Sequence, residues 1–172
     1  MMTTGVAIEI PEPFGSKLRQ NRADFGDPMA ATVPSHVTLM PPMILERADF
    51  AGICTILEDA ASCLPPFPMT LRGTGTFRPV SPVVFIAVSR GISYTEILAK
   101  ALQTKLGAPE PEFPFHPHVT IAHNLADDAL DRAYDELADF ECSFQVDAFH
   151  LYLHTDADGW TPEREFPLGR SV

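Results

Sequence analysis

The chain is short of cysteine and has no long apolar segment, and each shortage excludes a class of protein. Its 172 residues include three cysteines, none of which belongs to a CxxC pair. This pattern indicates free thiols in a cytoplasmic protein and argues against a disulfide framework. No apolar run approaches the roughly 20 residues that span a bilayer. The N-terminus lacks a basic segment followed by an apolar one, so we expect neither membrane association nor secretion.

Basic residues are also scarce, and the shortage is greatest in the second half. The chain carries 12 Lys and Arg against 23 Asp and Glu, a net charge of −11. Residues 1–90 contain 7 basic and 8 acidic side chains, whereas residues 91–172 contain 5 and 15. Long nucleic acids are bound through many contacts between Lys or Arg and phosphates. We therefore expect no long nucleic-acid surface, and any phosphate ligand to be a small nucleotide or an RNA 3′-end at a local site. The acidic surface favours a monomer.

Seventeen prolines divide the chain into short elements. Composition and alternation predict strands at 5–10, 35–40, 67–77, 82–89, 118–123 and 142–154, with an edge strand in the tail. Apolar residues spaced three and four apart predict amphipathic helices at 46–64 and 127–140, and further helices are placed at 14–22 and 93–106. For the third helix, Ser93-x-x-Glu96 is interpreted as a capping box and Gly107 as the C-terminal stop.

Two parts of the chain repeat one order of elements. His36 begins a strand that precedes the helix from 46 and the strand at Phe67, and His118 begins a strand that precedes the helix from 127 and the strand at Phe144. Such a repeat indicates two related structural units. The sequence therefore predicts an α+β fold in which residues 1–172 form one bilobal domain. It would have two pseudo-symmetric, mostly antiparallel small sheets, outer helices and a central cleft.

Both repeats open with nearly the same four residues. The motifs are His-Val-Thr-Leu at 36–39 and His-Val-Thr-Ile at 118–121. A shuffled chain of this composition is expected to contain only about 0.004 such motifs, so two of them at equivalent points of a repeat do not arise by chance. Residues i and i+2 of a strand share a face. Each strand therefore presents an imidazole and a hydroxyl on one face and buries its aliphatic residues on the other.

Two imidazoles that face one cleft form an acid–base pair near neutral pH, because histidine titrates there. One neutral imidazole of His36 and His118 can deprotonate a nucleophile while the other, protonated, donates to the leaving oxygen. The hydroxyls of Thr38 and Thr120 can hold non-bridging phosphate oxygens. This chemistry needs neither a metal nor another cofactor. The symmetry of the repeat leaves open which histidine is the base.

The paired HVTL and HVTI motifs, the VAIEIP segment near the start and the LYLH strand with a following aromatic residue resemble the two-histidine (2H) phosphoesterase superfamily. The nearest branch is the 2′-5′ RNA ligase-like one, and the resemblance covers most of the chain. It implies hydrolysis of a cyclic phosphodiester, such as an RNA 2′,3′-cyclic phosphate end or a small cyclic nucleotide. It also implies catalysis by His36 and His118, with Thr38 and Thr120 binding the phosphate.

Further residues are candidates for binding the substrate. His123 stands shortly after the second motif, where members of the family often carry a basic residue. In the strand 145–154, Tyr152 alternates with aliphatic residues, so it is expected to face the cleft, where its ring can stack on a base. His150 and His154 share the face of Tyr152 and are weaker candidates for contacting phosphate.

Two arginines near the strand 67–77 are candidate phosphate clamps. Arg78 follows this strand and Arg72 lies within it. A guanidinium matches the oxygens of a phosphate through paired N–H donors. Of the two, Arg78 is taken as the candidate for substrate binding.

Two alternatives remain at the level of the sequence. The cleft could bind a nucleotide or phosphate without turnover, as a sensor or accessory protein does. Alternatively, His116, His118 and His123 could hold a metal ion in a metal-dependent hydrolase. Pro117 restricts His116, however, and no carboxylate or cysteine completes the ligand set at a usual spacing. Such a metal site would also leave the matching motif at His36 unexplained.

Overall fold

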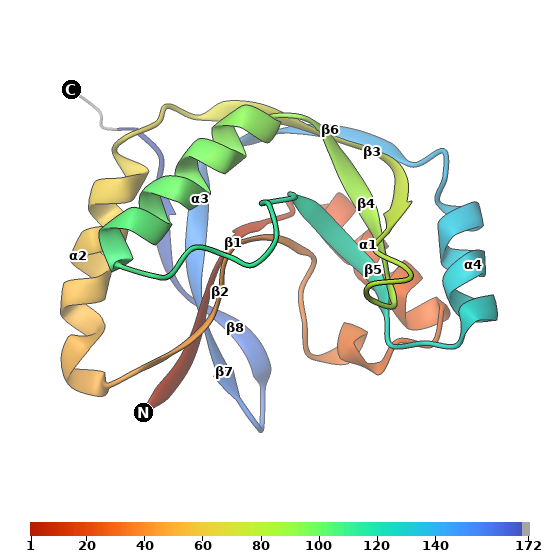
Figure 1. Ribbon diagram of the computed structural model, residues 1–172, viewed down its shortest axis with the longest axis horizontal. Helices are drawn as coiled ribbons and strands as arrows, with labels where there is room; N and C mark the ends of the chain where they lie inside the picture. Colours follow the sequence, from red (N-terminus) through yellow and green to blue (C-terminus); the bar gives the residue numbers. More distant parts are fainter. Residues whose placement is uncertain (170–172) are drawn as a thin grey trace.

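The computed structural model describes residues 1–169, which form two four-stranded antiparallel sheets and four α-helices (Figure 1). The first sheet has the order β2 (His36–Leu45), β1 (Met2–Glu9), β7 (Ala148–Thr155) and β8 (Gly159–Pro167). The second has the order β5 (His118–His123), β4 (Val83–Arg90), β3 (Phe67–Thr76) and β6 (Glu141–Val146). The predicted α+β fold with two antiparallel sheets is confirmed. In each sheet, the strand that begins with a motif histidine lies at an edge.

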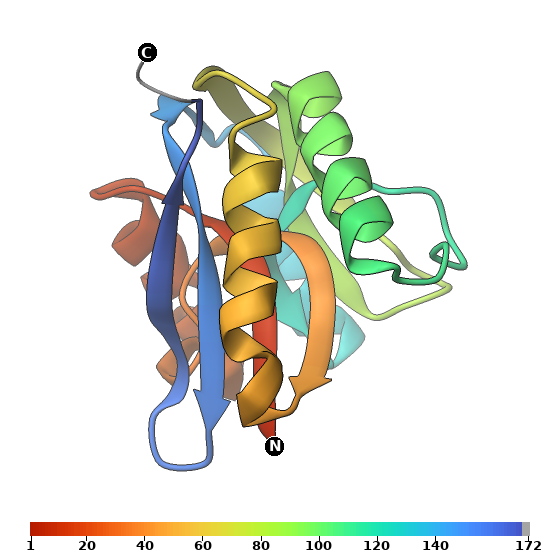
Figure 2. The ribbon, with the colours of Figure 1, turned by 90° about the vertical axis from the view of Figure 1, so that its left-hand side faces the viewer.

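The helices are divided between the sheets in pairs. They are α1 (Phe14–Asp24), α2 (Phe50–Ala61), α3 (Ile92–Leu106) and α4 (Asp127–Glu136), with short 3₁₀ turns η1 (Pro28–Ala31) and η2 (Arg47–Asp49). The helices α2 and α3 pack together and cover the first sheet, where α3 contacts β2 and α2 contacts β8 (Figure 2). The helices α1 and α4 cover the second sheet and both contact β5. Each histidine strand is therefore backed by a helix.

The two sheets exchange strands, which the repeat did not reveal. The strand that follows α2 and begins at Phe67 pairs in the sheet of His118, not in the sheet of His36. The predicted single strand 142–154 is wrong. It consists of β6 and β7, which are separated by Asp147 and belong to different sheets. The chain therefore returns to the first sheet at Asp147, so the second sheet is made from one continuous part of the sequence, β3 to β6, whereas the first combines β1 and β2 with β7 and β8.

The strand β2 continues beyond the point where the prolines were expected to end it. The prediction stopped at Met40, but the strand runs through Pro41-Pro42 to Leu45. Prolines lack the N–H that a central strand must donate, and edge strands and bulges tolerate them. Here β2 pairs only with β1, and the register shifts between Thr4 and Val6, opposite the prolines. The edge position thus explains why the strand can contain two consecutive prolines.

The start of α3 differs from the predicted capping box. The helix begins at Ile92, so Ser93 lies inside it, and Gly91 is the N-cap with a φ of 93°. A Cβ on Gly91 would lie 2.8 Å from the Pro68 carbonyl oxygen, so a glycine is required at this turn. The predicted C-terminal stop at Gly107 is confirmed, with a φ of 64°.

The apolar faces of the two sheets and their helices form one continuous core. The aliphatic residues next to the motif histidines all belong to it, and they are Val37, Leu39, Val119 and Ile121. The predicted alternation of the histidine strands is therefore confirmed on its apolar side. Within residues 1–169, no helix has the length and apolar character that crossing a membrane requires.

Candidate active site

A cavity of about 520 Å³ lies where the two histidine strands meet. Each strand contributes its imidazole and its hydroxyl, so the four motif residues His36, Thr38, His118 and Thr120 line one space. The strands are edge strands of different sheets, and β2 contacts β5. The remaining wall is formed by Gly5, Val6, Ala7, Arg22, Met29, Val33, Pro34, Met40, Pro42, Phe77, Ser81, Val83, His123, Tyr152 and Trp160.

The two imidazoles are held by the same backbone interaction. The Nδ1 atom of His36 lies 2.7 Å from the carbonyl oxygen of Pro34, and Nδ1 of His118 lies 2.7 Å from the carbonyl oxygen of His116. A carbonyl oxygen can only accept, so Nδ1 carries a hydrogen in both rings. In the neutral tautomer, Nε2 is then the basic atom. Both rings are thus fixed so that Nε2 gains or loses the proton.

The surroundings of His36 favour its neutral form. Burial lowers the pKa of the His36 imidazole, the hydrogen bond to Pro34 opposes this shift, and the positive charge of Arg22 lowers the pKa further. Burial acts in this direction because a low-polarity environment disfavours the charged imidazolium. A neutral Nε2 can accept a proton from a nucleophile.

The surroundings of His118 are aromatic. Its ring meets the ring of Phe77 edge-on at 4.9 Å between centroids, and the ring of Phe85 lies at 5.2 Å. Burial lowers the pKa of His118, the hydrogen bond to the His116 carbonyl opposes the shift, and the neighbouring imidazoles of His116 and His36 lower the pKa further. Both motif imidazoles are therefore shifted toward the neutral form.

The structure brings six of the seven predicted site residues to this cavity. His123 and Tyr152 line it together with the four motif residues. Arg78 does not line it. The guanidinium of Arg78 lies 2.9 Å from the carboxylate of Asp131 and 3.7 Å from that of Asp127, so α4 holds this cation outside the cavity. The sequence interpretation overlooked these acidic partners because they lie about 50 residues further along the chain.

The weaker candidates on β7 and β3 lie outside the cavity as well. The Nε2 atom of His150 is 3.8 Å from a carboxylate oxygen of Glu9, and the His154 ring lies 5.1 Å from that of Trp160. Arg72 is exposed on β3. None of these three side chains lines the cavity, whereas Tyr152 does.

The hydroxyl of Tyr152 is buried and has no hydrogen-bond partner among the described residues. A buried hydroxyl without a partner costs free energy. Burial and the nearby Glu9 carboxylate raise the pKa of this phenol, so it remains protonated. Tyr152 lines the cavity, while its hydroxyl oxygen is itself covered by protein atoms.

The family of the chain follows from comparison with known proteins. The sequence profile of the 2′-5′ RNA ligase superfamily matches residues 10–158. The chain belongs to the 2′-5′ RNA ligase superfamily. A Bacillus cereus (strain B4264) protein named "Putative phosphoesterase" is 32% identical over 177 residues, with 98% of each chain covered. A Bacillus thuringiensis (strain Al Hakam) protein of the same name is 31% identical with the same coverage.

Solved structures of other proteins share the fold of this chain. Escherichia coli LigT complexed with 3′-AMP superposes with a TM-score of 0.71 at 21% identity, and 98% of this chain and 99% of LigT are covered. The protein TT0787 of Thermus thermophilus gives a TM-score of 0.64 at 20% identity, with coverages of 99% and 100%. The resemblance to two-histidine phosphoesterases is thereby confirmed for family and fold.

Three cavity residues of this superfamily member were missed at the level of the sequence. Arg22 comes from α1, Phe77 follows β3 and Trp160 lies on β8. All three lie in elements other than the histidine strands, so no spacing rule links them to the motifs. The only available signal was weak, namely that α1 carries several basic residues in a chain that has few.

The alternative metal site receives no support from the arrangement of ligands. Among residues 1–169, no group of three or more His, Cys, Asp and Glu side chains has the geometry to hold a metal ion. His116 packs instead against aromatic rings, with its centroid 5.5 Å from Phe77 and 5.2 Å from Phe85. The three histidines of the proposed metal motif therefore do not converge on one point.

Proposed function

We propose that this protein is a metal-independent phosphodiesterase that hydrolyses a cyclic phosphodiester by paired-histidine acid–base catalysis. The single observation that supports this most is the convergence of His36 and His118 on one cavity, each fixed through Nδ1 by a backbone carbonyl. Of two imidazoles whose Nε2 atoms can gain or lose a proton, one can accept a proton from the nucleophile and the other can donate a proton to the leaving group.

In the proposed reaction, a water oxygen attacks the phosphorus atom of the cyclic phosphate. One imidazole Nε2 accepts a proton from that water, and the bond from phosphorus to one ribose oxygen breaks. The other imidazole, in its protonated form, donates a proton to the departing oxygen, which becomes a hydroxyl. One water is consumed and one phosphomonoester forms. Thr38 and Thr120 donate hydrogen bonds to the non-bridging oxygens as charge develops on them.

The composition of the cavity supports a nucleotide-like substrate. Its described lining contains one arginine and three histidines and no Asp or Glu, although the whole chain has a net charge of −11. Much of the remaining wall is apolar and includes the rings of Tyr152 and Trp160, against which a nucleobase can stack. Structures of E. coli LigT with 3′-AMP, ATP and NADP⁺ are consistent with a small nucleotide in this fold.

A panel of substrates tests the proposal. It contains nucleoside 2′,3′-cyclic monophosphates, a short RNA that ends in a 2′,3′-cyclic phosphate, and ADP-ribose 1″,2″-cyclic phosphate, each measured without and with EDTA. We expect turnover of at least one substrate by the wild type and its collapse in His36→Ala and His118→Ala. Arg72→Ala is the control, because this side chain is exposed on β3 and does not line the cavity.

Other results would redirect the assignment. Loss of turnover on adding EDTA contradicts the metal-independent mechanism, and turnover that survives both histidine substitutions contradicts the catalytic pair. Binding of nucleotides without turnover on any substrate would support the alternative of a non-catalytic nucleotide-binding module. Where turnover is found, the fastest substrate of the panel distinguishes an RNA 3′-end from a small cyclic nucleotide.

A further inference from the structure

We propose that Arg22 is the residue that provides the permanent positive charge for binding the substrate's phosphate in the cavity of His36 and His118. The inference rests on the proposed function, because it names a binding residue of that same site. Arg22 lies in α1, more than ten residues before the first motif, and neither HxT motif includes it.

The first argument is the distribution of charge. Among the described residues that line the cavity, Arg22 is the only Lys or Arg, and no carboxylate lines the space beside it. The charge of an imidazole depends on pH, whereas a guanidinium stays charged. Only Arg22 can therefore attract a phosphate over the whole physiological range of pH.

The second argument is the burial and hydrogen bonding of the guanidinium. Only 9% of the Arg22 side chain is exposed, and its Nε atom lies 2.8 Å from Oδ2 of Asp27. This interaction uses one of the five N–H donors of a guanidinium. No further side-chain hydrogen bond joins Arg22 to residues 1–169. The remaining donors of a cation that lines the cavity are thus available to a bidentate anion.

The third argument is that the guanidinium is anchored to the strand of His118. Oδ2 of Asp27 accepts both from Nε of Arg22 and from the backbone N–H of His123, at 2.8 and 3.0 Å. Oδ1 of Asp27 accepts from the backbone N–H of Met29 at 2.9 Å. A buried carboxylate thus joins α1 to the end of β5, which begins with His118. The cation is thereby fixed relative to one of the two catalytic imidazoles.

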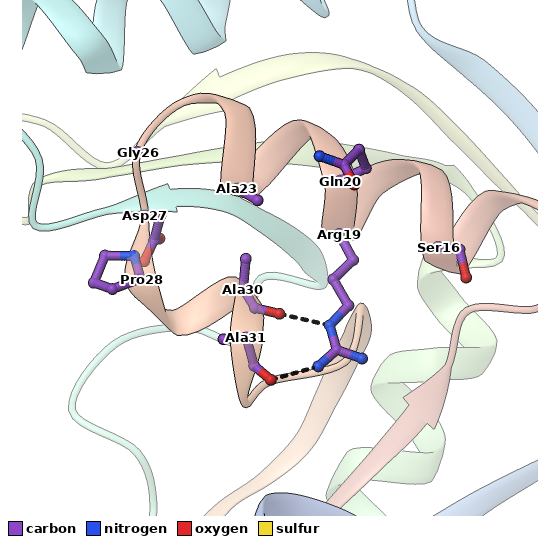
Figure 3. Close-up of a pocket in the computed structure, with 9 residues that line it drawn as sticks. All are labelled: Ser16, Arg19, Gln20, Ala23, Gly26, Asp27, Pro28, Ala30 and Ala31. Carbon is purple, nitrogen blue, oxygen red and sulfur yellow. Dashed lines mark hydrogen bonds between the residues drawn. The ribbon is translucent and has the colours of Figure 1, made fainter.

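Arg19 provides the matched control on the same helix. Its guanidinium donates from Nε to the carbonyl of Ala30 and from Nη2 to the carbonyl of Ala31, on the face of α1 that Figure 3 shows. Arg19 does not line the cavity of the histidines, and its pairing with two carbonyls ties α1 to η1. Arg19 and Arg22 thus share a helix and a type of side chain but differ in access to the site.

The test is the binding of inorganic phosphate, followed by NMR in the intact protein and measured without turnover. We expect Arg22→Gln to raise the Kd for phosphate by about 10- to 100-fold, the range for a lost charge-assisted hydrogen bond. Arg22→Lys is expected to recover part of the affinity, and Arg19→Gln to stay within about twofold of the wild type. The pKa of His36 should also rise in Arg22→Gln, because Arg22 lowers it.

A second variant covers the case in which Arg22→Gln does not fold, since that change leaves Asp27 buried without its cation. The double variant Arg22→Met with Asp27→Asn removes both charges, and it too is expected to lose phosphate affinity while retaining its fold. Phosphate binding equal to the wild type in either folded variant overturns the inference, as does a wild type that binds no phosphate. Because binding is measured apart from turnover, absence of catalysis on every substrate would contradict the proposed function and leave the role of Arg22 in binding standing.

Discussion

The two histidine strands, β2 and β5, share a backbone design and differ in what surrounds their imidazoles. Each is an edge strand, each begins with its histidine, and each fixes Nδ1 with the carbonyl two residues earlier. The positive charge of Arg22 contributes to lowering the pKa of His36. His118, by contrast, lies beside the rings of Phe77, Phe85 and His116. A duplicated backbone thus holds two chemically distinct sites.

The difference matters because acid–base catalysis requires the two partners to be in opposite protonation states. A symmetric pair would have equal affinities for the proton, and unequal surroundings separate the two roles. Burial lowers the pKa of both imidazoles, and at His36 the permanent positive charge of Arg22 acts in the same direction, whereas no Lys or Arg contributes to the shift of His118. We therefore expect His36 to act as the base and His118 as the acid. The predictions below test how far the two strands are equivalent.

The largest effect is expected from removing either imidazole. His36→Ala and His118→Ala should each lower kcat by about 10²- to 10⁴-fold, the usual contribution of a general acid or base. Because both groups act in one step, the double variant should be hardly slower than the worse single variant. Steady-state kinetics on the best cyclic substrate measure all three. A large loss in only one single variant would show that the strands are not a catalytic pair.

A substrate with a better leaving group separates the two roles. A leaving oxygen of lower pKa needs less protonation, so such a substrate should rescue the variant that lacks the acid more than the one that lacks the base. On the assignment above, rescue is expected for His118→Ala. Preferential rescue of His36→Ala would reverse the assignment while keeping the pair.

Smaller losses are expected at the hydroxyls. Thr38→Val and Thr120→Val each remove one donor with little change in shape, and each should lower kcat/KM by about 10- to 100-fold, as for a lost hydrogen bond to a charged group. Thr38 is exposed and Thr120 is half-buried, so the greater loss is expected at Thr120, where water screens the interaction less. Equal kcat/KM for the wild type and both variants would exclude phosphate binding by these hydroxyls.

The motif strands could be predicted from sequence because their signal is local. Side chains of a strand alternate between its two faces, so Val37 and Leu39 lie on one face and His36 and Thr38 on the other. The prediction required only that the apolar face be buried. The exchange of strands between sheets could not be predicted in the same way. Continuous strand-forming composition hides the break at Asp147, and pairing partners far apart in the sequence decide which sheet a strand joins.

For the candidate site, too, the sequence predicted the residues that belong to a local motif and not those that are placed by packing. His36, Thr38, His118 and Thr120 carry their own sequence signature, and the structure places them around one cavity. Arg22 has no such signature, because its position depends on how α1 packs against β5. Arg78 gave the opposite error. Its residue type suits phosphate, but acidic residues of α4 lie within reach of its guanidinium in the folded chain.

The pH dependence of kcat/KM tests whether both imidazoles are shifted in one direction. The base must be neutral and the acid protonated in the free enzyme, so the maximum lies between the two macroscopic pKa values. Burial lowers the pKa of both His36 and His118. The maximum is therefore expected on the acid side of 6.5, the ordinary imidazole value, with a fall of about tenfold per pH unit beyond each pKa.

The pH profile of kcat/KM in Arg22→Gln tests whether Arg22 acts on the imidazole of only one strand. Without the guanidinium, the pKa of His36 rises, so the acidic limb should move to higher pH while the basic limb, set by His118, stays nearly in place. Arg19→Gln should leave both limbs unshifted, since its guanidinium is bound to backbone carbonyls outside the cavity. Movement of both limbs together in Arg22→Gln would mean that Arg22 does not distinguish the two imidazoles.

The smallest effect is expected from Tyr152→Phe, which replaces a phenol in one wall of the cavity by a phenyl ring like that of Phe77 in the other. The first sheet presents the phenol of Tyr152, and the segment after β3 presents the phenyl ring of Phe77. The hydroxyl of Tyr152 has no partner within residues 1–169. Tyr152→Phe should therefore leave the free energy of unfolding unchanged or raise it by about 1 kcal/mol, because it removes an unsatisfied buried group. Chemical denaturation measures this value.

If that hydroxyl hydrogen-bonds the substrate equally in the ground state and the transition state, Tyr152→Phe should also raise KM by about two- to tenfold with little change in kcat. Tyr152→Leu is the companion variant, since it removes the ring as well and should cost further affinity if the ring stacks on a base. A stable Tyr152→Phe protein with the KM of the wild type would assign the wall contributed by Tyr152 to packing alone. The asymmetry of the site would then reside in Arg22 and the surroundings of the two imidazoles.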